Sequence, residues 1–427
     1  MNFLRRWRRQ FERSRVGRFL YPFSRDARLF LLATIISGIT FTGFQLFFNI
    51  YLRSRGFDLD FIGVLNAIPS GAALVAGVPM GILSDRLGPR RAMLIGLSVA
   101  TLAAAALVSA RTPFVMIVMS GVMGIANSLY FLSMAPFMMR ASGDRERTML
   151  FSLNFGLMTI SGAVGNLLAG QLPAWFAQWM GAPPDSPAAY QAVLLVSTLA
   201  GGLALIPIWL IREVRWPGPR RTAPAGLDEA RRLLRRSVLR MVLPSFIIGF
   251  GAAILIPYLN LFFKETFAIS DGQLGLVFSL SAAATGAASL VGPRIAERLG
   301  SKIKAVVATQ GASILFLLGM GFAPAYWIAA IAFLMRGALM NMSNPLYSTF
   351  IMEQTPERER GTVNSLFQLT WEVGWTVGPY ISGVVQARYG FAPLFVSTAG
   401  LYGLAVGLTW LFFHDTEARA KSAAAVA

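Results

Sequence analysis

The sequence of 427 residues contains no cysteine and only one histidine, His414. The lack of cysteine excludes disulfides, thiolate nucleophiles and cysteine metal sites. His414 stands at the edge of the last apolar run, where a solvated or interfacial ring is the simplest interpretation. A membrane-bound transferase would need a nucleophile, a base or a metal cluster, and the sequence offers none in a recognisable pattern. The residues therefore predict a protein that is not an enzyme and holds no cofactor and no metal.

Charged residues are scarce as well, at 14%, whereas 55% of the residues are hydrophobic and the mean hydropathy is +0.58. Soluble domains rarely have so apolar a composition, so the lipid bilayer is the expected solvent. Apolar runs of about 20 residues, the length that crosses a bilayer core, occur about twelve times. They cover residues 29–52, 61–83, 92–110, 114–137, 149–172, 191–211, 241–263, 273–293, 303–321, 325–350, 362–386 and 393–413.

The net charge of +18 raises the question of a nucleic-acid partner. The placement of the basic residues argues against one, because 32 of the 38 Lys and Arg residues fall in the two termini and in alternate loops. Cytoplasmic loops of membrane proteins carry such an excess of Lys and Arg. The bias predicts a multi-pass protein of the cell membrane with both termini in the cytoplasm.

A short charged segment after the second apolar run carries the most specific pattern in the chain. Residues 81–91 read Gly-Ile-Leu-Ser-Asp-Arg-Leu-Gly-Pro-Arg-Arg, and a weaker copy at residues 292–302 places Glu297 212 positions after Asp85. The spacing G-x-x-x-D-R-x-G-x-R-R resembles the loop signature between the second and third helices of major facilitator superfamily transporters. The resemblance implies an all-α polytopic membrane protein with twelve transmembrane helices in two pseudo-symmetric six-helix bundles, which works by alternating access.

Further matches relate the two halves of the chain. Arg147 and Arg360 correspond at an offset of 213, and Asn49 and Asn260 correspond at an offset of 211. Charged residues in register argue against chance similarity between apolar segments. We expect a basic N-terminus over residues 1–28, one bundle over 29–212, a linker over 213–238, a second bundle over 239–413 and a tail over 414–427.

The resemblance also implies a conformational gate in the charged loops. In the family, the acid that matches Asp85 lies near the cytoplasmic start of the eleventh helix, around Thr362, where the positive end of a helix attracts a carboxylate. A solvated loop that only obeys the topology rule is the alternative. The residues assigned to the gate are Gly81, Asp85, Arg86, Gly88, Arg90, Arg147, Glu297, Arg298 and Arg360.

Two formal charges lie deep inside predicted spans, Arg336 in the tenth and Glu372 in the eleventh. An unpaired charge at this depth costs several kcal/mol, so such residues usually have a partner. Each lies about 15 Å from one end of its span, near the midplane. We expect these two residues to form an ion pair beside a central cavity. The pair would separate when a substrate or a proton arrives, with Glu372 as the proton carrier. A static pair that fixes two helices is the alternative.

The other polar residues at this depth are mostly amides and aromatic residues. In the family fold, the first, fourth, seventh and tenth spans line the central path, which would bring these side chains into contact with substrate. An equally open alternative is that each amide bonds a neighbouring helix. The residues are Gln45, Asn49, Asn127, Tyr130, Tyr258, Asn260, Asn341, Asn344 and Tyr347, with Gln368, Trp371 and Trp375 on the eleventh span.

Amides beside aromatic faces suit a small neutral or amphipathic solute. The predicted function is secondary active transport by alternating access, most simply proton-coupled export. Uptake or exchange of a sugar or organic anion, with Arg336 as the anion site, and lipid flipping are the alternatives. The partners are then a small-molecule substrate and protons, the protein is expected to be a monomer, and no nucleic acid is involved.

Two segments outside the spans are predicted to form amphipathic helices on the inner leaflet. Phe3, Leu4, Trp7 and Phe11 alternate with arginines in the N-terminus, and residues 227–238 repeat the pattern in the linker. Basic amphipathic helices bind anionic lipid headgroups, which are the expected partners here.

Overall fold

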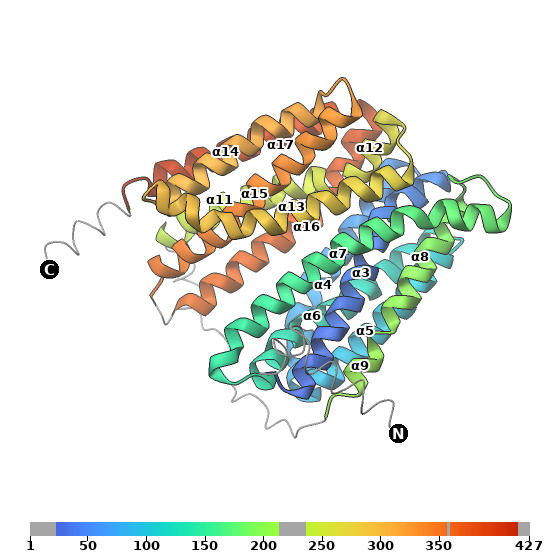
Figure 1. Cartoon of the computed structure of the whole chain (residues 1–427), viewed down its shortest axis with the longest axis horizontal. Helices are drawn as coiled ribbons and strands as arrows, with labels where there is room; N and C mark the ends of the chain where they lie inside the picture. The colour runs from blue at the N-terminus through green and yellow to red at the C-terminus, as the bar shows by residue number, and fades with distance from the viewer. Residues whose placement is uncertain (1–22, 213–235, 357–358, 417–427) are drawn as a thin grey trace, which may run out of the picture.

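The computed structural model describes residues 23–212, 236–356 and 359–416, and these residues form helices joined by short turns. The predicted amphipathic segment of the N-terminus and residues 227–235 of the one in the linker fall outside this part of the chain. Residues 236–238 of the linker segment instead begin a helix that runs to Leu255. The helices separate into two groups that lie side by side, one blue to green and one yellow to red in Figure 1.

The first bundle uses the helices of the N-terminal half. It consists of α3 (Arg25–Ser54), α4 (Leu59–Leu87), α5 (Pro89–Ser109), α6 (Pro113–Ala141), α7 (Asp144–Met180) and α8 (Pro187–Gly202), which continues into the short α9 (Leu205–Trp209). Within this bundle α3 packs against α7 and α8, and α6 packs against α4 and α5.

The second bundle repeats this arrangement. It consists of α11 (Arg236–Leu255), the 3-10 turn η1 (Ile256–Tyr258), α12 (Leu259–Phe267), α13 (Asp271–Arg298), α14 (Lys302–Gly321), α15 (Tyr326–Gln354), α16 (Arg360–Tyr389) and α17 (Ala392–Phe413). The predicted seventh span is therefore interrupted. Pro257 lies in η1, and a proline lacks the N–H that would continue the helical hydrogen bonding from α11 into α12.

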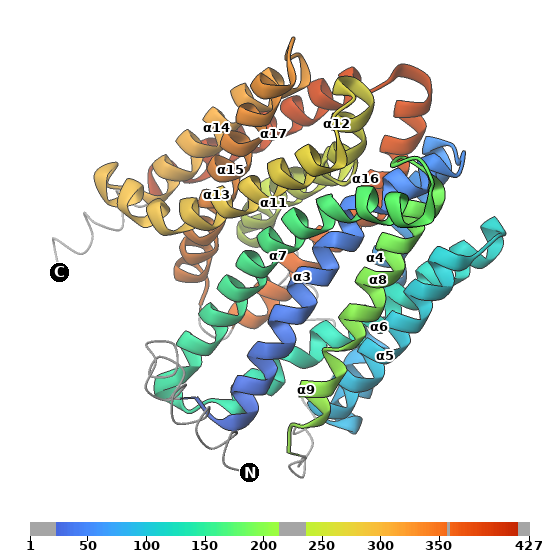
Figure 2. The ribbon, with the colours of Figure 1, turned by 45° about the vertical axis from the view of Figure 1, so that its right-hand side comes forward.

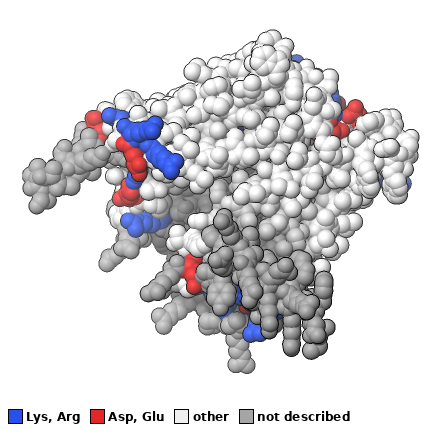
Figure 3. Space-filling view, in the orientation of Figure 1, with Lys and Arg blue, Asp and Glu red and all other residues white. Residues whose placement is uncertain are grey.

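The described helices have the length and surface of membrane spans. Ten of them, with α8–α9 and α11–α12 each taken as one span, are long and apolar enough to cross a bilayer. The more polar α15 and α16 are as long, and with them the count reaches the predicted twelve. Large apolar side chains such as Val75 and Leu290 are more than three quarters exposed. In Figure 3 the described charged side chains gather at the ends of the molecule and leave a broad white surface between them.

The two ends of the molecule carry different turns. At one end α4 meets α5 at Gly88, which has φ +80°, and α13 meets α14 at Gly300, which has φ +65°. Residues with a side chain rarely adopt these positive φ values, so glycine is required in both copies of the predicted charged loop. We call this the hinge end. At the opposite end, which we call the clasp end, α3 meets α4, α7 meets α8, and α12 meets α13.

The bundles contact each other mainly through two helix pairs, α4 with α16 and α7 with α13, and over a shorter stretch through α3 with α12. Near the clasp end both pairs approach closely: a Cβ on Gly383 would lie 2.4 Å from the carbonyl oxygen of Leu59, and one on Gly275 would lie 2.7 Å from the Cα of Gly170. Glycine permits this distance because it lacks a side chain. Gly63 of α4 meets Gly383, and Gly77 lies on the same face of α4, closer to the hinge end. A Cβ on Gly77 would nevertheless have no atom within 4 Å.

The distribution of the core agrees with this difference between the ends. One cluster of buried apolar side chains runs through both bundles and includes Tyr51 of α3 and Phe262 of α12. Two further clusters each belong to one bundle, around Phe30 in the first and around Phe350 in the second. The second view in Figure 2 shows the same grouping of helices into two bodies. The bundles are therefore joined at the clasp end and separate toward the hinge end.

Replacing Gly383 by Leu should weaken the joined state. The added side chain would overlap the α4 backbone at Leu59, and overpacking of this kind costs about 1–3 kcal/mol. The expected result is a lower thermal unfolding midpoint of the purified protein. Gly77→Leu is the matched control, because it adds the same side chain to an open position of the same helix pair. Equal losses in the two variants would contradict the described separation.

Candidate functional site

The interior face of α16 carries the polar and aromatic residues of the site. At 100° per residue, Gln368, Trp371, Trp375, Ser382 and Gln386 fall within a sector of about 60°. Ser382 and Gln386 are buried near the clasp end, whereas Gln368 and Trp371 are exposed toward the hinge end. The opposite face is apolar and exposed, as expected where a helix meets lipid. The polar face thus lines the space that opens between the bundles.

Two indole rings lie at the point where this face changes from buried to exposed. Trp371 and Trp375 stack with centroids 6.1 Å apart and planes 29° from parallel. The Nε1 of Trp375 is buried and has no hydrogen-bond partner among the described residues. Trp371 rests against Gly249 of α11, where any side chain would meet its ring. The pair therefore forms a fixed aromatic surface with one buried N–H donor that no described residue satisfies.

Glu372 lies beside this aromatic pair, on the side of α16 that faces α4. Its side chain is half-buried, and Ser70 of α4 faces its carboxylate. Among the described residues no basic side chain forms an ion pair with it. A carboxylate at this depth without a cation is a candidate for binding a proton or a cationic group.

Arg336 does not pair with Glu372, contrary to the expectation from the sequence. Its Nη2 donates to Tyr402 Oη of α17 at 2.6 Å, and the guanidinium also lies over the Tyr402 ring. Tyr402 in turn packs on Gly251 of α11, so Arg336 points into the second bundle and is buried there. The ion pair was predicted because Arg336 and Glu372 lie at equal depth in the membrane. Depth does not determine the direction in which a side chain leaves its helix, and Arg336 is directed toward α17.

The remaining predicted lining residues divide into exposed and bonded groups. Gln45 and Asn344 are exposed, and Asn127 and Asn341 are half-buried. Among the described residues, Asn344 bonds only to Asn341, and Asn341 bonds to the backbone of its own helix. The three tyrosines Tyr130, Tyr258 and Tyr347 are buried, and so are Asn49 and Asn260. Tyr347 donates a hydrogen bond to the carbonyl oxygen of Met241, and Tyr258 donates one to the carbonyl oxygen of Pro379.

Asn49 and Asn260 join the two bundles. Nδ2 of Asn49 in α3 donates to the carbonyl oxygen of Pro257 at 2.6 Å, and Nδ2 of Asn260 in α12 donates to that of Leu46 at 2.8 Å. The two bonds are related by the internal repeat, because Leu46 and Pro257 are also 211 residues apart. These amides therefore bond a neighbouring helix in the described conformation, which was the alternative to substrate contact.

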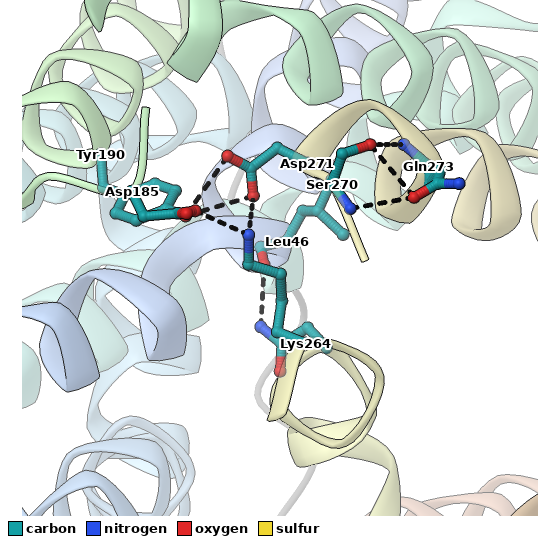
Figure 4. A network of polar contacts seen from close by, with 8 residues as sticks. Leu46, Asp185, Tyr190, Lys264, Ser270, Asp271 and Gln273 are labelled. Atoms are coloured by element: carbon teal, nitrogen blue, oxygen red, sulfur yellow. Dashed lines mark hydrogen bonds and ion pairs between the residues drawn. The ribbon is translucent and has the colours of Figure 1, made fainter. Parts of the chain in front are cut away.

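A charged network lies next to this pair at the clasp end (Figure 4). Lys264 Nζ of α12 contacts Oδ1 of Asp185 and Oδ1 of Asp271, each at 2.8 Å. Tyr190 Oη of α8 lies 2.7 Å from Asp185 Oδ1 and 3.2 Å from Asp271 Oδ1. Asp185 and Tyr190 belong to the first bundle, Lys264 and Asp271 to the second. We call these four residues the clasp.

A separate ion pair also crosses between the bundles. Arg53 Nε lies 3.1 Å from Glu265 Oε1, and both side chains are partly exposed. The clasp and this ion pair were not predicted from the sequence. The offset of 211 residues that relates Arg53 to Lys264 also relates Asp60 to Asp271. This shared register is the sequence pattern from which a charged cluster at this end could have been predicted.

The residues predicted for the gate gather at the hinge end. Asp85 and Arg86 end α4, Glu297 and Arg298 end α13, and Asp85 has no ion pair among the described residues. Two arginines bind backbone carbonyls: Arg90 that of Trp209 at 2.6 Å, and Arg360 that of Met352 at 3.0 Å.

These features agree with comparisons to known proteins. The Major Facilitator Superfamily model matches residues 30–250 and 241–426, so the chain belongs to this family of transporters. Among solved structures, the nucleoside transporter NupG aligns with a TM-score of 0.71 at 17% identity, over 92% of this chain and 99% of that one. The D-xylose-proton symporter aligns with a TM-score of 0.69 at 14% identity, over 90% and 97%. At these identities the likeness concerns the fold.

Curated relatives match over shorter segments. Multidrug resistance protein MdtG of Proteus mirabilis (strain HI4320) is 27% identical over 187 residues, which are 43% of this chain and 46% of that protein. The Multi-drug resistance efflux pump PmrA homolog of Lactococcus lactis subsp. lactis (strain IL1403) is 29% identical over 178 residues, 40% of this chain and 42% of that protein. The chain thus matches these relatives over less than half of their length.

Tyr402→Phe should destabilise the second bundle. The change removes the hydroxyl that binds Arg336 and leaves a buried guanidinium with fewer partners; a hydrogen bond to a charged group contributes about 1.5–3 kcal/mol. A lower thermal unfolding midpoint is the expected result. Tyr389→Phe, at a position that is 70% exposed, is the matched control. A Tyr402 variant as stable as this control would show that Arg336 does not depend on the hydroxyl.

Proposed function

We propose that this transporter exports a small amphipathic compound in exchange for protons, by rocking of the two bundles about the site on α16. The orientation is taken from the positive charge of the loops at the hinge end, which marks that end as cytoplasmic. In this orientation the described conformation is open to the cytoplasm and closed to the outside.

The observation that carries the proposal is the position of Glu372 next to the stacked indoles. A planar amphipathic solute would lie with its apolar face against Trp371 and accept a hydrogen bond from Trp375 Nε1 through a polar atom. Glu372, which has no basic partner among the described residues, would release its proton to the cytoplasm when the solute arrives. After the bundles rock, the carboxylate would take a proton from the outside as the solute leaves.

The gate would act when the hinge end closes. Asp85 would then dock on the start of α16, where the positive end of the helix attracts a carboxylate. The clasp would open only while the hinge end is closed, because a membrane path open at both ends would dissipate the gradient. The relatives named as multidrug resistance proteins support export, although they match only part of the chain.

Glu372→Gln should uncouple transport from the proton gradient. The amide keeps the shape of the side chain but cannot exchange a proton, so efflux of a fluorescent amphipathic dye from proteoliposomes should lose its response to a pH gradient. Dye exchange without a gradient should persist. Asp58→Asn removes an exposed carboxylate outside the spans and serves as the control. An unchanged pH response of the Glu372 variant would reject the coupling role.

Asp85→Asn should slow transport without unfolding the protein. Losing the attraction between the carboxylate and the helix end removes on the order of 1 kcal/mol, roughly a several-fold loss in the population of the state closed at the hinge end. Proteoliposome flux measures the loss, and an unchanged thermal midpoint separates it from misfolding. Wild-type flux in the Asn variant would contradict the gating role.

A further inference from the structure

We propose that the clasp is a proton-binding site: when the bundles are joined, Asp271 carries a proton taken from the clasp side of the membrane. The pH on that side then sets how firmly the two bundles are held together. The site is separate from Glu372 and the inference goes beyond the proposed transport cycle.

The first argument counts hydrogens. Tyr190 Oη lies within 3.3 Å of three carboxylate oxygens: Asp185 Oδ1 at 2.7 Å, Asp271 Oδ1 at 3.2 Å and Asp271 Oδ2 at 3.3 Å. A phenol has one hydrogen to donate, and the shortest contact assigns it to Asp185. The contact between Tyr190 and Asp271 then joins two oxygens with no hydrogen between them. A proton on Asp271 supplies the missing donor.

The second argument counts charge. Asp185, Asp271 and Lys264 together carry one net negative charge when all are ionised, and the nearby Arg53 and Glu265 neutralise each other. The side chains of Asp271 and Lys264 are only 5% and 16% exposed. Lys264 is shared between two carboxylates, so it compensates the charge of the buried Asp271 only in part, and one bound proton makes the cluster neutral.

The proton belongs on Asp271 and not on Asp185. The Asp185 side chain is 73% exposed, and its hydrogen bond from Lys264 lowers the pKa of its carboxyl group, so it remains ionised. Asp271 is enclosed by Lys264 of α12, Tyr190 of α8 and Asp185 of the α7–α8 loop. The part of α7 packed against this end of α13 presents Gly170 and Gln171, which carry no charge.

The internal repeat provides a contrast within the same molecule. Asp60 begins α4 as Asp271 begins α13, and the two are 211 residues apart. Asp60 is exposed, and within the described part of the chain its carboxylate bonds only to the N–H of Phe61. Only the copy in the second bundle is enclosed by residues of the other bundle, so only this copy couples a proton to their contact.

The sign of the pH effect follows from the burial. When the clasp opens, Asp271 is exposed to water and ionises as an ordinary carboxylic acid. The joined state therefore binds one more proton than the open state, and acid on the clasp side favours the joined state. For one proton, the ratio of the two states changes by at most about tenfold per pH unit.

The absence of cysteine makes the test direct. Thr112→Cys and Pro324→Cys place spin labels on the exposed α5–α6 and α14–α15 turns at the clasp end, away from the clasp residues. Pulsed EPR on the full chain in lipid nanodiscs gives the distance distribution between the bundles from pH ~5 to ~9. We expect the short-distance population to grow as the pH falls. A distribution that is unchanged over this range would overturn the proposal.

Two variants assign the response to the clasp. Asp271→Asn imitates the protonated acid and should keep the short distance at every pH. Asp185→Asn leaves Lys264 to neutralise Asp271 alone, so its response should also be lost. Asp60→Asn, at the exposed copy of the repeat, should titrate like the wild type. In a Glu372→Gln background, which removes the contribution of the proposed coupling site, Asp271→Asn should still abolish the remaining pH response. A wild-type response in either clasp variant would refute the assignment.

Discussion

The whole arrangement depends on how two bundles of helices can adhere inside a lipid bilayer. Apolar burial drives little association there, because lipid tails are as apolar as the helix surfaces. The described contact relies on close backbone approach at glycines such as Gly275 and Gly383, and on polar groups that satisfy each other across the interface. Both features are concentrated at the clasp end, which allows the hinge end to part without breaking either bundle.

The polar residues of the spans have three different environments. Asn49 and Asn260 bond across the bundles, Arg336 bonds inside the second bundle, and Glu372 with its neighbouring indoles faces the space between the bundles. A polar group that is satisfied by its own bundle can remain so as the bundles move, whereas a group between the bundles changes its surroundings with each conformation. This difference selects Glu372 as the coupling candidate and leaves Arg336 inside the core.

The repeat explains both the symmetry and its limits. The paired amide bonds and the two positive-φ glycines, Gly88 and Gly300, are equivalent in both halves because each is needed to form the bundle or the contact. The clasp departs from this symmetry, since Asp271 is enclosed and its counterpart Asp60 is exposed. Alternating access needs two bundles of similar shape, but it does not require equal electrostatics in the two halves.

The sequence by itself determined the membrane solvent, the twelve spans, the repeat and the glycines of the charged loops. Each follows from run length or from backbone requirements that act locally along the chain. Only the tertiary structure decided that Arg336 turns to Tyr402 and that Lys264 gathers two carboxylates from different bundles. The physical reason is that depth in the bilayer is encoded by position along a helix, whereas the direction of a side chain depends on how each helix is rotated against its neighbours.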